Sequence, residues 1–276
     1  MTYTVPTQLE FDRMLIIHQD RMQDDEDSYP LKERLQFTCA DISSLDLFGR
    51  DLQGVLFNRC VFSGDLSVVN FSGSAVLNCC FHDAILQGCN FESTILTDTS
   101  FRNCDLTNAN FTRVRGGRQC FTDCDLTGAR CEFGNFKSAN FDNCNLTKVD
   151  MHHSDLRKAI FESCEVAGLC LCAADLRKAE FHKTNLLIVS DSMPWSNIII
   201  TAESMCIGDR CGTHEEWFSE SIEEVESYQD PMGFRIYCYD DWGRWAPALK
   251  LMCEQVRIGL FNTNTVVIEE HAGTVT

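Results

Sequence analysis

The stretch TSFRNCDLTNANFTRV, residues 99–114, decides how this chain folds. Its large apolar residues Phe101, Leu106 and Phe111 stand five positions apart, with polar residues between them. The same step sets thirty-one repeat centres between Phe37 and Leu186. A period of five matches neither the 3.6 residues of a helical turn nor the two-residue alternation of a strand. The sequence therefore predicts a repeat architecture rather than an ordinary globular domain.

Each repeat has the order small, polar, apolar, polar, polar, as in Cys104-Asp-Leu-Thr-Asn and Ala139-Asn-Phe-Asp-Asn. This pattern covers about 150 residues and resembles the pentapeptide-repeat family. The resemblance implies a mainly β fold, the right-handed quadrilateral parallel β-helix, in which four pentads form the four sides of one coil. It also implies that the apolar residue and the small residue two positions before it face inward, which closes a narrow core without voids.

Four pentads per coil require residues twenty apart to stack on one side, and the sequence meets this condition. One column is all Phe and the next is aliphatic: Phe81, Phe101, Phe121, Phe141, Phe161 and Phe181, then Leu66, Leu86, Leu106, Leu126, Leu146, Val166 and Leu186. Thirty-one pentads make about 7.5 coils. At ~4.8 Å per coil, the solenoid would be roughly 36 Å long.

Two irregularities interrupt the repeat. A four-residue step between Phe62 and Leu66 is expected to remove one outward residue at a corner and to leave the later columns in register. Gly116 takes a core position within the basic segment 114–118. Because glycine inside a strand usually marks a bulge, we favour a locally bulged side over a mobile basic contact point.

Three regions follow from the extent of the repeat: an N-terminal arm at 1–36, the β-helix at 37–190 and a C-terminal region at 191–276. An open β-helix exposes apolar core and unpaired strand edges, so each end needs a cover. Residues 8–22 are predicted to form an amphipathic helix. The residues expected to face the first coil are Leu9, Met14, Ile17 and Met22. We favour a helical cap, with a partner-binding or dimerising arm as the alternative.

The C-terminal region is predicted to be a small acidic α+β domain. Strands are expected at 198–201 and 205–208, helices from Thr213 to Tyr228 and from Trp245 to Ile258, and a last strand from Val266. Its segments Cys206-Ile-Gly and Thr213-His-Glu-Glu-Trp loosely resemble the ends of pentapeptide proteins encoded by bacteriophages and prophages. That resemblance implies a phage or prophage origin.

The chain is acidic and rich in cysteine, with a net charge of −18 and 17 cysteines in 276 residues. Seven cysteines share one register, two positions before a repeat centre: Cys60, Cys79, Cys89, Cys104, Cys124, Cys144 and Cys164. We expect them to be small, buried, reduced thiols, which indicates a reducing compartment. With no long apolar run and no signal-peptide pattern, the expected location is the cytoplasm, that of a bacterial host if the protein is phage-encoded.

Sorting the charged residues by side predicts a polarised solenoid. In chain order, the sides after the Leu side are called the third and the fourth. The net charge is −4 on the Phe side, −4 on the Leu side, −1 on the third side and +5 on the fourth side. We name as acidic faces Asp83, Asp123, Asp142 and Glu162 on the Phe side and Asp65, Asp105, Asp125 and Glu165 on the Leu side. The basic face on the fourth side comprises Arg115, Arg118, Lys137, Arg157, Lys158, Arg177 and Lys178.

Like charges stacked one coil apart repel, so negative groups are expected to lie near the basic face and offset its charge. Asp155 and Asp175 lie in the same pentads and are expected to supply part of it. The rest would come from the acidic C-terminal region, from an acidic partner or from a nucleic-acid phosphate.

Two explanations compete for the acidic faces. Family members that inhibit or protect DNA gyrase resemble B-DNA in width and carry acidic surfaces that occupy the enzyme's DNA saddle. Duplex DNA, however, carries about one charge per 1.7 Å, much denser than the charge of these two sides. A solvated surface that serves solubility is therefore the simpler interpretation, and partial DNA mimicry is the functional one.

The sequence offers no phosphate-binding glycine loop or nucleophile elbow, so we expect neither enzyme activity nor a cofactor. His152 and His153 face outward with no evident base or metal partner. Zinc ligation by Cys206, Cys211 and His214 is a weaker alternative to reduced thiols, because Cys-x4-Cys-x2-His departs from the usual ligand spacing. No metal is expected.

We therefore predict a non-enzymatic binding scaffold. Its acidic faces would bind a protein with a basic surface, such as a gyrase, a topoisomerase-like enzyme or a phage-defence protein, and inhibit or modulate it by partial DNA mimicry. The alternative is an interaction or structural module whose C-terminal domain selects the partner while the solenoid is a rigid spacer. The acidic balance argues against direct nucleic-acid binding. No membrane contact is indicated, and a homodimer stays open.

Overall fold

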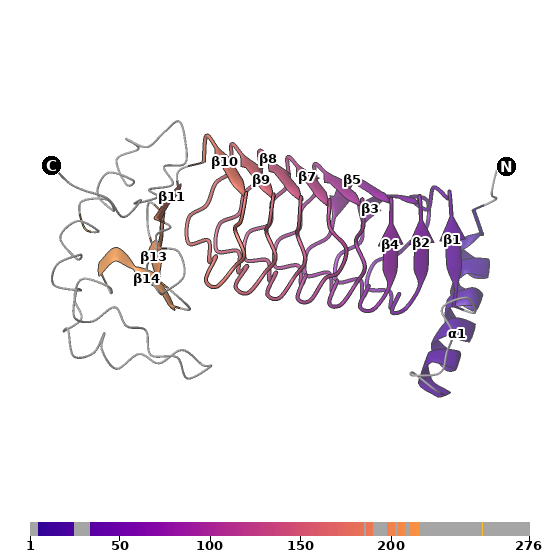
Figure 1. Ribbon diagram of the computed structural model, residues 1–276. Helices are drawn as coiled ribbons and strands as arrows, with labels where there is room; N and C mark the ends of the chain where they lie inside the picture. The colour runs from indigo at the N-terminus through magenta and orange to yellow at the C-terminus, as the bar shows by residue number, and fades with distance from the viewer. Residues whose placement is uncertain are drawn as a thin grey trace, which may run out of the picture.

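The computed structural model describes residues 5–24, 34–184, 186–189, 198–201, 204–207, 210–215 and 250. Along these residues the chain passes from a helix through a parallel β-solenoid of about seven turns to an antiparallel sheet (Figure 1). The predicted mainly β, parallel solenoid is thereby confirmed. No helix among these residues is both long and apolar enough to cross a membrane.

Helix α1 spans Gln8–Asp24 and precedes the solenoid. The solenoid strands are β1 (Gln36–Thr38), β2 (Leu56–Asn58), β3 (Val61–Asp65), β4 (Ala75–Leu77), β5 (Cys80–Ile85), β6 (Ser100–Arg102), β7 (Cys120–Thr122), β8 (Asn140–Asp142), β9 (Ile160–Glu162) and β10 (Glu180–His182). They are followed by β11 (Leu186–Val189), β12 (Ile198–Thr201), β13 (Ser204–Ile207) and β14 (Arg210–Thr213).

The Phe side is a seven-stranded parallel sheet in the order β10-β9-β8-β7-β6-β5-β3. Its register is the predicted twenty-residue step, with Phe101 opposite Phe81 and Phe121. On the fourth side, β1, β2 and β4 form a shorter parallel sheet. Isolated parallel bridges continue the coil-to-coil pairing elsewhere, for example between Asp105 and Asp125 on the Leu side.

The core is a stack of aromatic rings. From Phe62 to Phe181 the rings of the Phe column lie nearly parallel, with neighbouring centroids 4.3 to 4.9 Å apart. A second stack on the third side, Phe71, Phe91 and Phe111, has centroid spacings of 4.9 Å and meets the first stack edge-on. The predicted Phe column is confirmed, and its spacing equals the separation of hydrogen-bonded strands.

The seven cysteines of the shared register are buried, as predicted, at 0 to 5% exposure. The thiols of Cys104, Cys124, Cys144 and Cys164 each donate to the carbonyl oxygen of a Phe 23 residues earlier, at 3.4 to 3.6 Å. Burial raises the pKa of Cys89 to about 12. These thiols are therefore small, buried core groups. Cys60 differs from Cys89, because the hydrogen bond with Cys79 lowers its pKa to about 7.

The four-residue step is absorbed at one corner, as predicted. Val61 pairs with Cys80, nineteen residues on, whereas Gly64 pairs with Ala84, twenty residues on, and a bulge separates the two registers. Gly64 has a φ of 84°, a backbone conformation that glycine adopts at low cost. All later columns keep the twenty-residue register.

At Gly116 the regular coil-to-coil hydrogen bonding of the fourth side is interrupted, and the bulged side stays a prediction. Elsewhere on this side each repeat centre donates its N–H to the following coil, as Leu96 does to the oxygen of Arg115. Within the described coils Gly116 does not make this bond to Asn135. Instead the side-chain amide of Gln119, 1% exposed, donates to the Asn135 oxygen at 3.2 Å. The Gln119 side chain thus supplies the donor that the Gly116 backbone does not provide to Asn135.

Helix α1 caps the first coil, but with a different face from the predicted one. Phe11 and Leu15 are buried, and the Phe11 ring lies 5.6 Å from that of Phe37. Of the residues predicted to face the coil, three are exposed and that prediction is wrong: Leu9, Met14 and Ile17. The fourth, Met22, does approach the first coil near Gly54.

Polar side chains explain which face of α1 packs on the coil. Gln8 accepts from the Asp46 N–H at 2.7 Å, and Gln19 donates to the Asp51 oxygen at 2.9 Å. His18 is 2% exposed, accepts from the Leu35 N–H at Nδ1 and donates from Nε2 to the Gln53 oxygen. These bonds satisfy backbone groups that an open solenoid end leaves unpaired. The same face of the helix makes these bonds and buries Phe11 and Leu15.

Beyond the solenoid, β11 to β14 form a four-stranded antiparallel sheet in chain order. The predicted strands at 198–201 and 205–208 correspond to β12 and β13, whereas β11 and β14 were not predicted. Leu186, the last repeat centre, pairs antiparallel with Thr201 and belongs to this sheet. Residues 214–215 are helical directly after Thr213, as expected, and the rest of that helix, most of the next one and the last predicted strand lie outside the described residues.

Candidate functional site: the charged faces

The Leu-side acids form a column along the solenoid. Asp105 and Asp125 are direct partners in successive coils, and Asn145 and Glu165 continue the column. Asp65 lies at its start, opposite Ile85. The four predicted acids thus lie in one column. Only Asp105 and Asp125 are one strand spacing apart, because Ile85 and Asn145 separate them from Asp65 and Glu165.

Each aspartate of this column also has a local structural role. Asp65 Oδ1 accepts from the Ser67 N–H at 2.9 Å and from its hydroxyl at 2.7 Å, and Asp125 makes the same pair of bonds with Thr127. Such bonds stabilise the turn that follows. The Ser67 hydroxyl and N–H lower the pKa of Asp65, so it stays ionised at neutral pH.

An uncharged asparagine in this column makes the backbone bond of the pair, without the bond to the hydroxyl. Asn145 Oδ1 accepts from the Thr147 N–H at 3.1 Å, in the place that aspartate takes one coil earlier. The turn therefore requires an acceptor oxygen and not a carboxylate. The negative charges of Asp105 and Asp125 are not demanded by the fold.

On the Phe side the acids occupy two positions. Asp83 and Asp123 sit at left-handed corners, and each accepts from the asparagine one coil on, Asn103 or Asn143, at 2.7 Å. The Asn103 amide lowers the pKa of Asp83. Asp142 and Glu162 are direct strand partners on β8 and β9.

The basic face is neutralised in part by its own acids. Arg157 makes two bonds to Asp155, at 2.8 and 2.6 Å, and reaches Asp175 at 3.5 Å. Arg177 makes the same two bonds to Asp175, which confirms the predicted compensation. Arg118 pairs with Asp98 at 2.6 Å, while Arg115 donates to the Ser93 oxygen. In residues 34–184, the cations of this face without an ion pair to a carboxylate are Arg115, Lys137, Lys158 and Lys178.

The structure places the three candidate zinc ligands of the C-terminal region near one another along the backbone. Cys206 and Cys211 are direct partners on β13 and β14, and His214 opens the helical residues that follow β14. The backbone thus places the three residues in one neighbourhood. Ligation stays a prediction.

The structure brings together a cluster that the sequence analysis missed. His152 has partners: its Nδ1 lies 2.8 Å from Asp150 Oδ1, and its ring meets that of Phe133 edge-on. The expectation that His152 lacks a partner is therefore wrong. The signal was present in the sequence, because Glu132 and His152 are twenty residues apart and Asp150 is two positions before His152.

Comparisons with known proteins agree with this architecture. The pentapeptide-repeat model matches eight copies, over residues 78–113 and 124–162. No curated protein sequence matches the chain.

Several solved structures are similar. A trypsin-treated form of QnrB1, a plasmid-mediated fluoroquinolone resistance protein, is 22% identical, with 54% of this chain and 79% of that one covered and a TM-score of 0.21. HetL from the cyanobacterium Nostoc sp. strain PCC 7120 is 19% identical, with 54% and 86% covered and a TM-score of 0.24. A protein of the Arabidopsis thaliana thylakoid lumen is 27% identical, with 43% and 70% covered and a TM-score of 0.19. The family match, the repeated pentads and their twenty-residue stacking together identify residues 78–113 and 124–162 as pentapeptide repeats.

Proposed function

We propose that this protein is a binding scaffold whose acidic faces engage a basic protein surface, and that the surface is the DNA-binding groove of a nucleic-acid enzyme. The chain would then inhibit or modulate that enzyme by partial DNA mimicry. The solenoid supports the proposal as a rigid rod with carboxylates at coil spacing on two adjacent sides. Its long columns of side chains suit extended contact with a partner better than catalysis, which requires a concave pocket.

One observation carries the proposal: Asp105 and Asp125 are adjacent partners, and the turn they stabilise accepts asparagine at Asn145. Like charges directly opposite one another destabilise a sheet. Their presence at neighbouring positions, where Asn145 shows that an uncharged residue also stabilises the turn, favours a role for the charge itself.

The test removes charge without removing the turn. Asp105→Asn/Asp125→Asn keeps the Oδ1 acceptor of each turn and removes the Asp105 Oδ2 that accepts from Gln87 at 2.6 Å. We therefore expect the free energy of unfolding to change by no more than about 1–2 kcal/mol. The matched control, Asp51→Asn/Glu92→Gln, removes two negative charges from the nearly balanced third side. Full-length parent and both variants are used to capture proteins from bacterial lysate at low salt.

We expect the parent and the control to retain the same partner and the Leu-side variant to lose most of it. Capture should also weaken as the ionic strength rises, because the Debye length falls from about 10 Å at 0.1 M to about 3 Å at 1 M. Equal capture by all three proteins would reject the proposal and favour partner selection by the C-terminal domain. A DNA-supercoiling assay then decides whether gyrase is the partner.

A further inference from the structure

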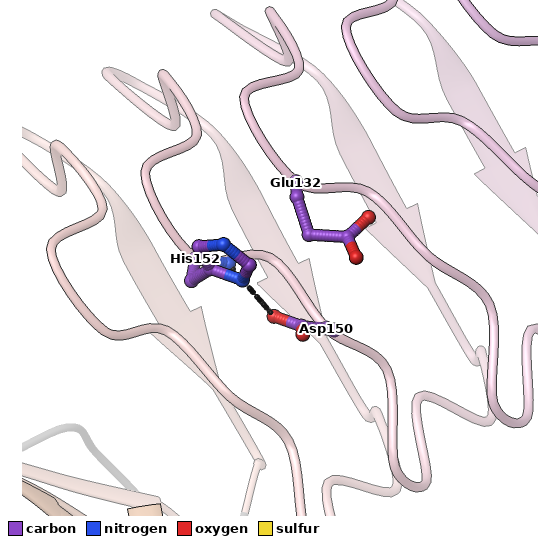
Figure 2. A group of neighbouring side chains, drawn as sticks. All are labelled: Glu132, Asp150 and His152. Carbon is purple, nitrogen blue, oxygen red and sulfur yellow. Dashed lines mark hydrogen bonds and ion pairs between the residues drawn. The ribbon is translucent and has the colours of Figure 1, made fainter. Parts of the chain in front are cut away.

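Three side chains from two successive coils converge on the third side of the solenoid (Figure 2). They are Glu132, Asp150 and His152, each half-buried, and each offers one nitrogen or oxygen atom such that all three atoms lie within 4.8 Å of one another. Asp150 and His152 flank the buried Met151, while Glu132 occupies the position of His152 one coil earlier. The cluster therefore spans the seam between two coils.

The three side chains are held in place by neighbouring groups. Asp150 Oδ1 accepts from the His152 N–H at 3.1 Å, and Thr112 Oγ1 lies 2.8 Å from Glu132 Oε2. The rings of Phe133 and His153 meet the His152 ring edge-on, each at 5.3 Å between centroids. Such supporting contacts orient ligands in metal sites and spare the entropy of ordering them.

The two carboxylates of the cluster lack the compensation that the basic face shows. Asp155 and Asp175 pair with arginines in their own pentads. In the solenoid residues that the structure describes, neither Glu132 nor Asp150 forms an ion pair with a lysine or an arginine. Asp150 contacts His152 and also hydrogen-bonds the Cys170 thiol one coil on. A doubly charged cation at this point would balance the two carboxylates.

We propose that Glu132, Asp150 and His152 bind a divalent transition-metal ion, for which Zn²⁺ is the appropriate probe. One imidazole nitrogen and two carboxylate oxygens are ligands that zinc accepts, at about 2.0 to 2.2 Å. Tetrahedral ligands at such distances stand about 3.4 Å apart, which half-buried side chains within 4.8 Å reach by small rotations. The fourth position faces outward, toward water or a donor from a partner. The bound ion would link two successive coils.

The experiment uses the metal-free full-length chain, titrated with Zn²⁺ by calorimetry and with Co²⁺ by visible absorption. Glu132→Gln/His152→Gln removes two ligands and keeps Asp150, whose bond to the backbone stabilises the turn. We expect the parent to bind one ion at this site and the variant to bind it roughly tenfold or more weakly. Zn²⁺ should also raise the unfolding temperature of the parent more than that of the variant.

Two controls identify the site. His182→Gln disrupts another histidine–carboxylate pair, with Glu180 at 3.1 Å, and should leave the affinity unchanged. Cys206→Ser/Cys211→Ser removes two ligands of the other candidate zinc site. The protein with these substitutions should still bind the ion at Glu132, Asp150 and His152. Equal affinity in Glu132→Gln/His152→Gln and the parent, or loss of binding only in the cysteine variant, would overturn the proposal.

Discussion

At Gly116, backbone from the neighbouring coil fills the space that a side chain would need. A Cβ there would lie 2.6 Å from Thr97 Oγ1 and 2.9 Å from the Thr97 nitrogen, and the φ of 114° is a conformation that other residues rarely adopt. Gln119 donates to the Asn135 oxygen, which the Gly116 backbone does not reach. This irregular side therefore involves two residues, of which only the glycine is evident from the repeat pattern.

We predict that Gly116→Ala costs about 1–3 kcal/mol in the free energy of unfolding, because it combines backbone strain with a steric clash. Gly73→Ala is the matched control: its φ is 62°, yet an added Cβ would meet nothing within 4 Å, and the equivalent corners carry Ser93 and Arg113. Urea unfolding measures both. A Gly116→Ala cost no larger than that of Gly73→Ala would contradict the packing explanation.

At the scale of the element, α1 shows where an amphipathic pattern is ambiguous. Its apolar residues surround much of the helix, so sequence periodicity alone does not select a face. The selection comes from Gln8, His18 and Gln19, which meet backbone groups of the first coil. Leu9, Ile16 and Ile17 stay exposed, and a partner-binding or dimerising role for that surface stays a prediction.

For the cap we predict that Phe11→Ala destabilises the first coil by about 3–5 kcal/mol, because it leaves a cavity against Phe37. Ile17→Ala, on the exposed surface, should change stability by less than about 0.5 kcal/mol. Hydrogen exchange of the amides near Phe37 and Phe57 reports the first coils directly. Similar protection in both variants would show that α1 does not cover the end.

Acid should weaken the same cap. Burial lowers the pKa of His18, with the Gln53 bond opposing it only in part. The unfolded chain therefore binds a proton more readily than the folded one. The stability that His18 contributes is present above its unfolded pKa of about 6.5 and is lost as the pH falls below it.

At the scale of the molecule, the five-residue period determines most of the fold, because it fixes which residues face inward and which stack twenty apart. The Phe column, the buried cysteines and the acidic strip all follow from that register. The choice of the α1 face that packs on the solenoid and the formation of β11 depend on contacts between distant parts of the chain, which no local sequence pattern predicts. The cluster of Glu132, Asp150 and His152 could have been predicted from the sequence, since Glu132 and His152 share a column. Finding it requires a comparison of acidic and histidine residues in successive coils.

The charge distribution of the whole molecule leads to the most direct measurement. If the acidic faces occupy a DNA-binding groove, a short DNA duplex must compete with the chain for the captured partner. We predict that increasing duplex displaces the full-length protein completely, and displaces Asp51→Asn/Glu92→Gln equally well. A complex that persists at saturating duplex would contradict DNA mimicry by the acidic faces.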